Sequence, residues 1–381
     1  MIETHTGQGR LSLEDLAREL ATPSTPPDAT WHASLVELRP PADGSALRTL
    51  CAAHGIRVLD TISRQLAELS STIQPAPGTE GARAAFVEQR LATAPAPDLY
   101  GCWAWFPWMR TIVHVLPPDE YFAVVTNRNQ DKITRDEQRG LRLKRVGVVG
   151  LSVGGEAAFT VAQEHLCGHI VLADFDELDL SNLNRLGAGV DELTVNKSVI
   201  TARRIARVNP YLAVTLHPRG VSNETLDAFL DGLDLLVDEC DSLPLKLSLR
   251  VAALRRGLNV IFAADERGFL SVEPYATHRQ LPPFHGLLTE PPLVRNAYAT
   301  PFAFMRALTE WLGGWERISP RSRDSLPRIG HDLCGYPQLA SEARFAAGQL
   351  GSVARRLLLG EELPPSWQHV DLEELLPAVA R

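Results

Sequence analysis

The sequence has little cysteine, no excess of positive charge and no long apolar run. Its 381 residues include 5 cysteines, and because no two of them form a CxxC pair, we expect reduced, buried thiols and no structural zinc. Lysine and arginine total 38 against 46 for aspartate and glutamate, and the resulting formal charge of -8 disfavours a general nucleic-acid-binding surface. No stretch of about 18 uninterrupted apolar residues occurs. The start of the sequence lacks a basic patch followed by an apolar core, so we expect a cytoplasmic protein that does not span a membrane.

The composition is that of a globular protein, with 45% hydrophobic and 22% charged residues. This excludes a disordered tail, a collagen and a disulfide-held mini-protein. Clusters among the 27 prolines and 27 glycines punctuate the chain. They predict an N-terminal accessory domain over 1–125, a nucleotide-binding domain over 126–292 and a C-terminal helical extension over 293–381.

The two flanking parts carry no recognisable chemistry. In the first, an amphipathic helix around 11–20 and a strand near 57–60 predict a mixed α/β arrangement. The aromatic run 103–108 favours a packed core over a ligand platform, because aromatic side chains at this density usually fill volume. In the last part, helical patterns around 302–312 and 340–359 indicate a helical cap or a dimerisation appendage.

The middle part alternates short apolar runs with helical patterns, which predicts a Rossmann-like, doubly wound and mainly parallel sheet. Helices are expected over 197–208 and 244–256. The expected strands are RVGVVG, HIVLAD, AVTLHP, DLLVDE, NVIFAA and GFLSVEPY.

The first of these strands runs directly into a glycine-rich turn, Gly150-Leu-Ser-Val-Gly154-Gly155, and then into a helix. Backbone amides at such a helix start suit a bound phosphate. The spacing is that of a GxGxxG fingerprint with Ser152 in place of the second glycine. Either the backbone approaches the phosphate less closely there, or the serine hydroxyl donates a bond instead.

Acidic residues follow the second strand. Asp174 lies about twenty residues beyond the turn, where a carboxylate can accept hydrogen bonds from both ribose hydroxyls. Asp176 comes next to it, and either residue alone could also cap a loop. The turn and Asp174 together fit an NAD(P)-dependent oxidoreductase as well. That alternative leaves the polar segments SNLNR, Asn196-Lys197 and ECDS unexplained.

These segments, within LADFDELDLSNLNRL, Asn196-Lys197 and VDECDSLPLKLSL, resemble the ThiF/MoeB/HesA family, the bacterial relatives of ubiquitin-activating enzymes. The resemblance covers about 127–275. Members of this family adenylate a carboxylate, commonly the C-terminal glycine of a small carrier protein. The resemblance implies ATP and Mg²⁺ as cofactors and a homodimer as the working form.

Site residues follow from the resemblance, position by position. The ATP phosphates are expected at Gly150, Ser152, Gly154 and Gly155, and the ribose at Asp174 with Asp176 beside it. The triphosphate is expected against Asn182, Arg185 and Lys197, and magnesium on Asp241. Arg128, in the segment TNRNQDKITRDEQ, is the candidate that reaches the partner subunit's site, with Arg135 as an alternative. Asn182 could equally cap a turn, whereas a lysine at a helix start is unfavourable and argues for a role of Lys197.

The sequence also departs from the family. It has no CxxC pairs to bind zinc, and no cysteine between Cys240 and Cys334, so a covalent sulfur step is not expected. Cys240 adjoins Asp241, but a cysteine at the end of a buried strand is more often packing than a nucleophile. Downstream polar residues are expected to be solvated loop residues, with His285 the one to test: Asp265, Glu266, Arg267, His278 and His285.

The sequence therefore predicts an ATP-dependent adenylyltransferase that activates a carboxylate as its acyl-adenylate and releases pyrophosphate. The substrate is open among a carrier-protein C-terminus, a peptide, a small acid and a modified tRNA nucleoside, of which the acidic balance disfavours the last. Besides the oxidoreductase, a non-catalytic nucleotide-binding scaffold is the other alternative. Ser152 in the turn and the missing cysteine motivate it.

Overall fold

The computed structural model describes residues 5–7, 10–22, 30–39, 43–76, 79–287, 303, 306, 309 and 314–376. The helix expected around 302–312 falls almost wholly outside these residues. Two compact units emerge. The larger comprises Met1–His5, Gly140–Thr201 and Thr215–Arg381, and the smaller comprises Thr6–Arg139 and Ala202–Val214. Each is described by itself, and the domain boundaries expected from the sequence stay predictions.

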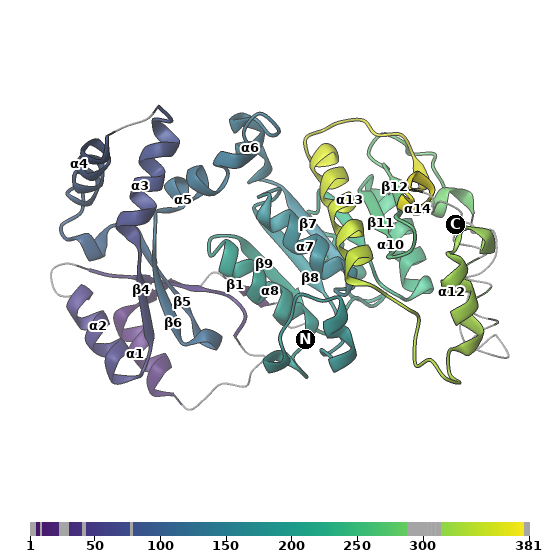
Figure 1. Cartoon of the computed structure of the whole chain (residues 1–381), viewed down its shortest axis with the longest axis horizontal. Coiled ribbons are helices and arrows are strands. Elements are labelled where there is room, and N and C mark those ends of the chain that lie inside the picture. The colour runs from purple at the N-terminus through teal and green to yellow at the C-terminus, as the bar shows by residue number, and fades with distance from the viewer. Residues whose placement is uncertain are drawn as a thin grey trace. The chain divides into compact units, whose positions relative to one another are not determined.

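An eight-stranded sheet forms the centre of the larger unit (Figure 1). Its strand order is β1-β9-β8-β7-β10-β11-β12-β13, and β7 is parallel to both β8 and β10, as β10 is to β11. β12 and β13 continue the sheet antiparallel. The strands are β1 (His5–Gly7), β7 (Arg145–Val149), β8 (His169–Ala173), β9 (Ala213–His217), β10 (Leu235–Asp238), β11 (Asn259–Ala263), β12 (Phe269–Glu273) and β13 (Ser366–His369).

This order confirms the Rossmann-like sheet that the sequence predicts. The chain winds outward from β7 to β8 and β9 on one side, then returns to β10 and β11 on the other. In such sheets ligands bind where the winding reverses, outside the carboxyl ends of the strands. The reversal lies here between β7 and β10. Both strands are almost fully buried, because helices cover the two faces of the sheet.

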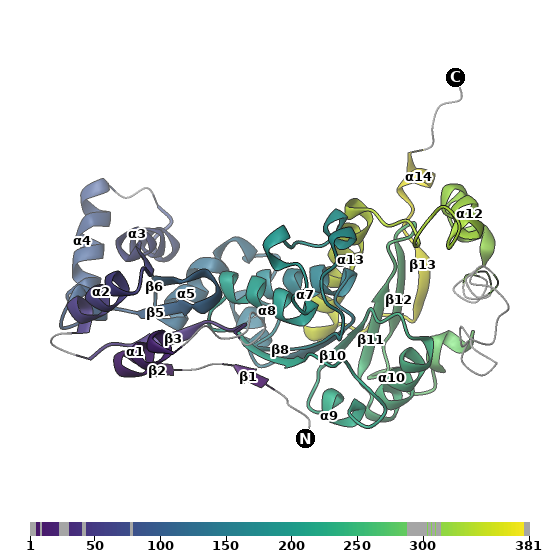
Figure 2. The ribbon, with the colours of Figure 1, turned by 90° about the horizontal axis from the view of Figure 1, so that it is seen from below.

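Helices α7 (Val153–Gln163) and α13 (Ala340–Leu358) cover one face of this sheet, and α9 (Leu226–Leu230) and α10 (Leu243–Arg256) cover the other (Figure 2). α13 approaches α7 so closely that a Cβ on Gly351 would lie 2.7 Å from Thr160 Cγ2. The C-terminal helix is thus part of this unit's core. The remaining helices are α8 (Lys197–Val208), α12 (Pro320–Ser325) and α14 (Leu372–Leu375).

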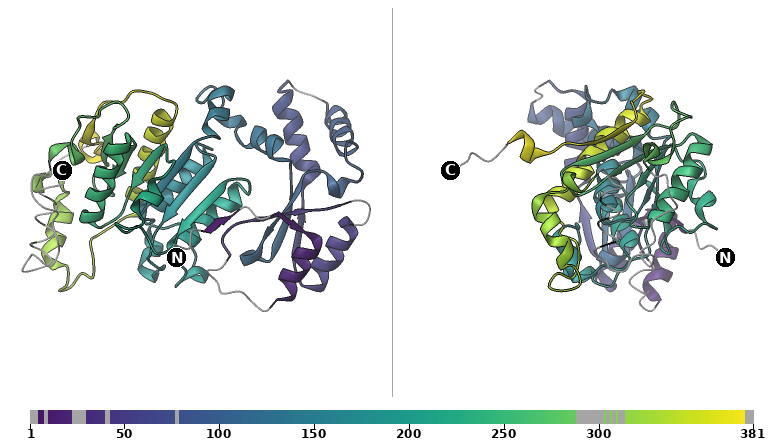
Figure 3. Two further views of the ribbon diagram at one scale, coloured as in Figure 1. Left: turned by 180° about the vertical axis from the view of Figure 1, so that it is seen from behind. Right: turned by 90° about the vertical axis from the view of Figure 1, so that its right-hand side faces the viewer.

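The smaller unit has its own five-stranded mixed sheet, of order β2-β3-β5-β6-β4, with helices packed along it (Figure 3). Trp103 and Trp105 of the aromatic run are each 2% exposed and belong to its core, which confirms the packing interpretation. Its strands are β2 (Arg10–Ser12), β3 (Ser34–Glu37), β4 (Arg57–Asp60), β5 (Cys102–Phe106) and β6 (Thr111–Val115). Its helices are α1 (Leu13–Ala21), α2 (Asp43–Ala53), α3 (Ile62–Ile73), α4 (Glu80–Leu91), α5 (Pro118–Val125) and α6 (Arg135–Leu141).

Within the described part of the chain, none of the helices has both the length and the apolar character that crossing a membrane requires.

Candidate nucleotide-binding site

The glycine-rich turn between β7 and α7 lies against the end of β10. Gly150 has a φ of +80°, and a Cβ there would lie 2.4 Å from the Glu239 carbonyl oxygen, so only glycine fits. A Cβ on Gly154 lies 3.1 Å from the Glu239 side chain, and one on Gly155 lies 3.2 Å from Thr201 Oγ1. Ser152 precedes α7 and makes no side-chain capping bond to it. The turn therefore brings the first amides of α7 to the point where the winding reverses.

Asp174 fixes this turn from the end of β8. One carboxylate oxygen accepts from the Leu151 amide at 2.6 Å and the other from the Asp176 amide at 2.8 Å. The side chain is 7% exposed, and burial raises its pKa, against the lowering effect of those two hydrogen bonds. A carboxylate oxygen can accept two hydrogen bonds. Each Asp174 oxygen accepts one from a backbone amide, so each can accept a second one from a ribose hydroxyl.

Lys197 opens α8 beside Asp176. Its Nζ lies 2.9 Å from Asp176 Oδ2, and its amide donates to the Asp176 carbonyl at 2.9 Å. The lysine side chain is 8% exposed and the aspartate side chain 49%. The cost of a cation at a helix start is thus offset by a paired carboxylate. The pair holds the ammonium group at the same edge of the sheet as the turn.

Asn182 and Arg185 belong to the short 3-10 helix Leu180–Asn184 and the residue after it. Asn182 Oδ1 accepts from the Asp179 amide at 3.0 Å, so the turn-capping role that the sequence left open is present. Arg185 donates to Asn184 Oδ1 at 2.8 Å, yet its Nε is buried with no hydrogen-bond partner among the described residues. A buried N–H left without an acceptor is costly, and an anionic ligand would relieve that cost.

Asp241 lies just beyond β10, before α10, with an exposed side chain. Asp265, after β11, accepts from Gln338 Nε2 at 2.7 Å. Burial raises the pKa of Asp265, the Arg185 charge lowers it and the Asp241 charge raises it further. The charges of Arg185 and Asp241 thus both act on the Asp265 carboxyl group. We call these three residues, at one side of the candidate site, the rim.

Asp265 and its neighbours correct one expectation from the sequence. Asp265, Glu266 and Arg267 are partly buried rather than solvated. Glu266 accepts from the Ser319 amide, the Ser322 hydroxyl and the Tyr336 hydroxyl at 2.5–2.8 Å. His285 Nε2 lies 3.3 Å from Ser271 Oγ, and burial lowers the pKa of His285. Because the donors come from residues far along the chain, no local pattern could have revealed these contacts.

A buried ionic network, which we call the core network, lies behind the rim. Arg250 pairs with Asp238 and, at 2.5 Å, with Glu273, and all three side chains are 0% exposed. Lys246 Nζ donates to the Asp238 carbonyl at 3.0 Å. Glu273 also accepts from the Tyr275 hydroxyl at 2.6 Å. Arg250 gave no signal in the sequence, because a helical arginine is normally exposed.

The cysteines divide between buried and exposed positions. Cys240 is buried and donates to Asp238 Oδ1 at 3.0 Å, and burial raises the pKa of its thiol well above the usual value. The buried, hydrogen-bonded thiol agrees with the packing role that we expect, and the absence of a nucleophilic role stays a prediction. Cys334 is exposed, contrary to the expectation that the thiols are buried. Over the described residues, no group of three or more histidine, cysteine or acidic side chains could hold a metal ion.

Arg128 lies in the smaller unit, in the 3-10 helix Asn127–Asn129, with an exposed side chain. Arg135 begins α6 and donates to Gln130 at 3.2 Å. The other site candidates gather in the larger unit, whereas the link of Arg128 to the site stays a prediction.

The strand order and the glycine turn define a Rossmann-like α/β protein with a candidate nucleotide-binding turn. Residues 126–283 match the ThiF family, so the chain carries a ThiF family domain. Uncharacterized protein MT1398 of Mycobacterium tuberculosis is 42% identical over 291 residues, which cover 76% of this chain and 41% of that protein. The tRNA threonylcarbamoyladenosine dehydratase of Bacillus subtilis is 32% identical over 138 residues, 35% of this chain and 54% of that enzyme. The chain thus spans about two-fifths of the length of the Mycobacterium tuberculosis protein and about half of the length of the Bacillus subtilis enzyme.

Solved structures with a similar course of the chain share little sequence with it. The E. coli tRNA N6-threonylcarbamoyladenosine dehydratase has a TM-score of 0.43 and 16% identity, over 62% of this chain and 94% of that one. E. coli MccB with MccA-N7isoASN has a TM-score of 0.45 and 14% identity, over 81% of this chain and 87% of that one.

Proposed function

We propose that the chain is an ATP-dependent adenylyltransferase that activates a carboxylate as its acyl-adenylate in the cytoplasm. The observation that carries the proposal is the buried Nε of Arg185, which has no hydrogen-bond partner among the described residues and whose charge acts, with that of Asp241, on Asp265. A dinucleotide needs the turn and Asp174 alone. A triphosphate with a metal ion also needs the cations and the exposed carboxylate that surround them here.

In the proposed reaction a carboxylate oxygen of the substrate attacks the α-phosphorus of ATP. The bond to the bridging oxygen breaks, and pyrophosphate leaves with the electron pair. Negative charge grows on the phosphate oxygens, where Arg185, Lys197 and the amides of the turn neutralise it. The site requires no covalent protein nucleophile.

The carboxylates at the rim suit Mg²⁺, which prefers hard oxygen ligands. Asp241 would hold the ion, and Asp265 supports the same rim while bonded to Gln338. When bound, the ion would offset the negative charge of the phosphates. Asp174 positions the ribose and keeps the turn in place through Leu151.

The proposal includes a homodimer in which Arg128 of one chain completes the site of the other. The substrate is a carboxylate at the C-terminus of a carrier protein or peptide, or a small acid. Among the relatives, an adenylyltransferase and sulfurtransferase of Yarrowia lipolytica, 29% identical over 140 residues, has adenylation chemistry in its name.

Calorimetry with ATP and Mg²⁺, and separately with NADH, tests the proposal. We expect tight binding of ATP with magnesium and negligible binding of NADH. Pyrophosphate exchange into ATP in the presence of candidate carboxylates then tests the chemistry. Stronger binding of NADH would favour the oxidoreductase, and ATP binding without exchange for any carboxylate would favour the scaffold.

A further inference from the structure

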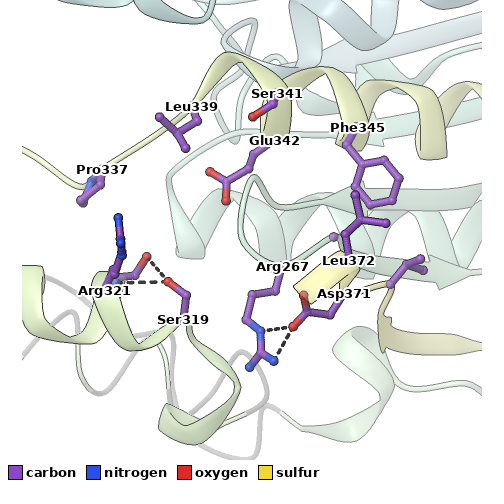
Figure 4. Close-up of a pocket in the computed structure, with 13 residues that line it drawn as sticks. Arg267, Ser319, Arg321, Pro337, Leu339, Ser341, Glu342, Phe345, Asp371 and Leu372 are labelled. Atoms are coloured by element: carbon purple, nitrogen blue, oxygen red, sulfur yellow. Dashed lines mark hydrogen bonds and ion pairs between the residues drawn. The ribbon is translucent and has the colours of Figure 1, made fainter. Parts of the chain in front are cut away.

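A pocket of about 470 Å³ lies next to the rim, in the larger unit (Figure 4). Its walls come from the start of β12, from α12, from the start of α13 and from the residues before α14. Apart from Arg267 and Gly268, its lining residues follow residue 283 and so lie outside the ThiF match. The pocket is therefore a feature of this chain's C-terminal part, and it is large enough for a ligand of several residues.

Only a thin wall separates the pocket from the rim. Pro337 and Leu339 line the pocket, whereas Gln338 between them donates to Asp265 of the rim at 2.7 Å. The Gln338 carbonyl accepts from Asn184, the neighbour of Arg185, at 2.8 Å. A molecule in the pocket therefore lies one residue's thickness from groups that we assign to ATP and magnesium.

The pocket combines an apolar surface with two opposite charges. Leu339, Phe345 and Leu372 supply apolar contacts. Arg321 rises from α12 on one side, and Glu342 comes from the first turn of α13 on the other (Figure 4). Among the residues that the structure describes, the Arg321 side chain forms no hydrogen bond or ion pair. By contrast, Arg267 at the pocket wall is fully engaged with Asp371 and Glu374.

We infer that this pocket binds the extended peptide segment that precedes the carboxylate to be adenylated, and that it selects an acidic side chain next to an apolar one. An extended peptide offers an acidic side chain for Arg321 and an apolar side chain for the surface around Phe345. A small acid would not both fill the pocket and reach across the Gln338 wall to the phosphates. The inference rests on the proposed function, because it takes the rim as the place of the reacting carboxylate.

Affinity selection tests this inference by binding, without any turnover. A mixture of N-acetyl tetrapeptides, randomised at three positions before a C-terminal glycine, is dialysed against the full chain with ATP and Mg²⁺, and bound peptides are identified by mass spectrometry. We expect enrichment of sequences that pair aspartate or glutamate with an apolar residue. Arg321→Glu should reduce their binding about tenfold and favour lysine-containing peptides instead, as expected for the loss of a charged hydrogen bond.

Two further variants make the result decisive. Ser341→Trp, on the exposed first turn of α13, fills the pocket and should abolish selection of all peptides. Arg344→Glu changes an exposed arginine of the same helix that does not line the pocket, and should leave selection unchanged. Equal selection by the wild type and Ser341→Trp, or by the wild type and Arg321→Glu, would overturn the inference.

ATP affinity measured on the same variants is expected to be unchanged. Failure of the wild type to bind ATP would count against the proposed function, whereas peptide selection reports on the pocket alone.

Discussion

Asp238 is the last residue of β10 and Asp241 follows it closely, yet the two carboxylates have opposite surroundings. Asp238, in the core network, is 0% exposed and bound by Arg250, Lys246 and Cys240. Asp241, at the rim, is exposed. In the core network both carboxylates are paired with cations, Asp238 with Arg250 and Lys246, and Glu273 with Arg250. A buried arginine nitrogen without a hydrogen-bond partner among the described residues occurs in both groups, as Arg250 Nη2 and as Arg185 Nε. The two groups therefore differ in their carboxylates: those of the core network are paired inside the fold, whereas Asp241 is exposed to a ligand.

The pKa values follow the same division. Burial alone would raise the pKa of Asp238, but the charges of Lys246 and Arg250 hold it below its usual value. At the rim, burial raises the pKa of Asp265, and the cation Arg185 offsets this only in part. A bound metal ion would supply the missing positive charge. Substitutions at the rim and in the core network test whether the two groups of charges differ in their roles.

The largest effect is expected from Asp241→Ala. Loss of a metal-holding carboxylate should lower adenylation about a thousandfold, because several kcal/mol of transition-state stabilisation disappear. Thermal unfolding should not change, since the side chain is exposed. Asp227→Ala removes a carboxylate that is 79% exposed and paired only at the surface, so it serves as the matched control with normal activity. Normal pyrophosphate exchange in Asp241→Ala would remove this residue from the site.

The next effect concerns the partner subunit. If Arg128 completes the neighbouring site, Arg128→Ala and Asp241→Ala chains should each be inactive alone and recover activity when mixed. A mixed dimer has one site that lacks both residues and one intact site, so about a quarter of the wild-type rate should return after random exchange. Exchange itself is verified with differently tagged chains. No recovery after verified exchange would mean that Arg128 acts in its own chain or has no role.

On the other side of the comparison, Arg250→Met should destabilise the larger unit by about 3 kcal/mol, because Glu273 becomes a buried carboxylate without a cation and Asp238 keeps only Lys246. Urea unfolding measures the loss. The double variant Arg250→Met, Glu273→Gln removes the unpaired carboxylate and should regain part of the stability. If Arg250→Met unfolds like the wild type, the core network does not hold the fold.

The sequence predicted the sheet and the glycine turn because both rest on local patterns. Apolar runs of strand length and a turn that only Gly150 can make are visible in a few consecutive residues. The core network and the Asp265 contacts were out of reach, since Arg250 meets Glu273 and Asp265 meets Gln338 only through the fold. The assignment of Asp241 as a metal-holding residue came from family resemblance, and its role at the rim stays a prediction.

The smallest effect is expected at a buried histidine of the larger unit. His165 follows α7, is 5% exposed, and burial together with the Arg142 charge lowers its pKa to about 4. In the unfolded chain His165 becomes protonated below about pH 6.5, whereas in the folded chain it becomes protonated only near pH 4. Folding stability is therefore lost as the pH falls from 6.5 to about 4. Between pH 7 and pH 5 the loss due to His165 should be about 2 kcal/mol.

His165→Asn removes the titrating group and preserves the backbone, because the residue has a φ of +54° and asparagine tolerates that region. Urea unfolding at pH 7 and pH 5 should show that the variant loses about 2 kcal/mol less than the wild type between the two values. His331→Asn, at an exposed position, should lose as much as the wild type. Identical losses in His165→Asn and the wild type would mean that His165 takes up its proton without unfolding. The larger unit would then hold the buried imidazolium in its folded state.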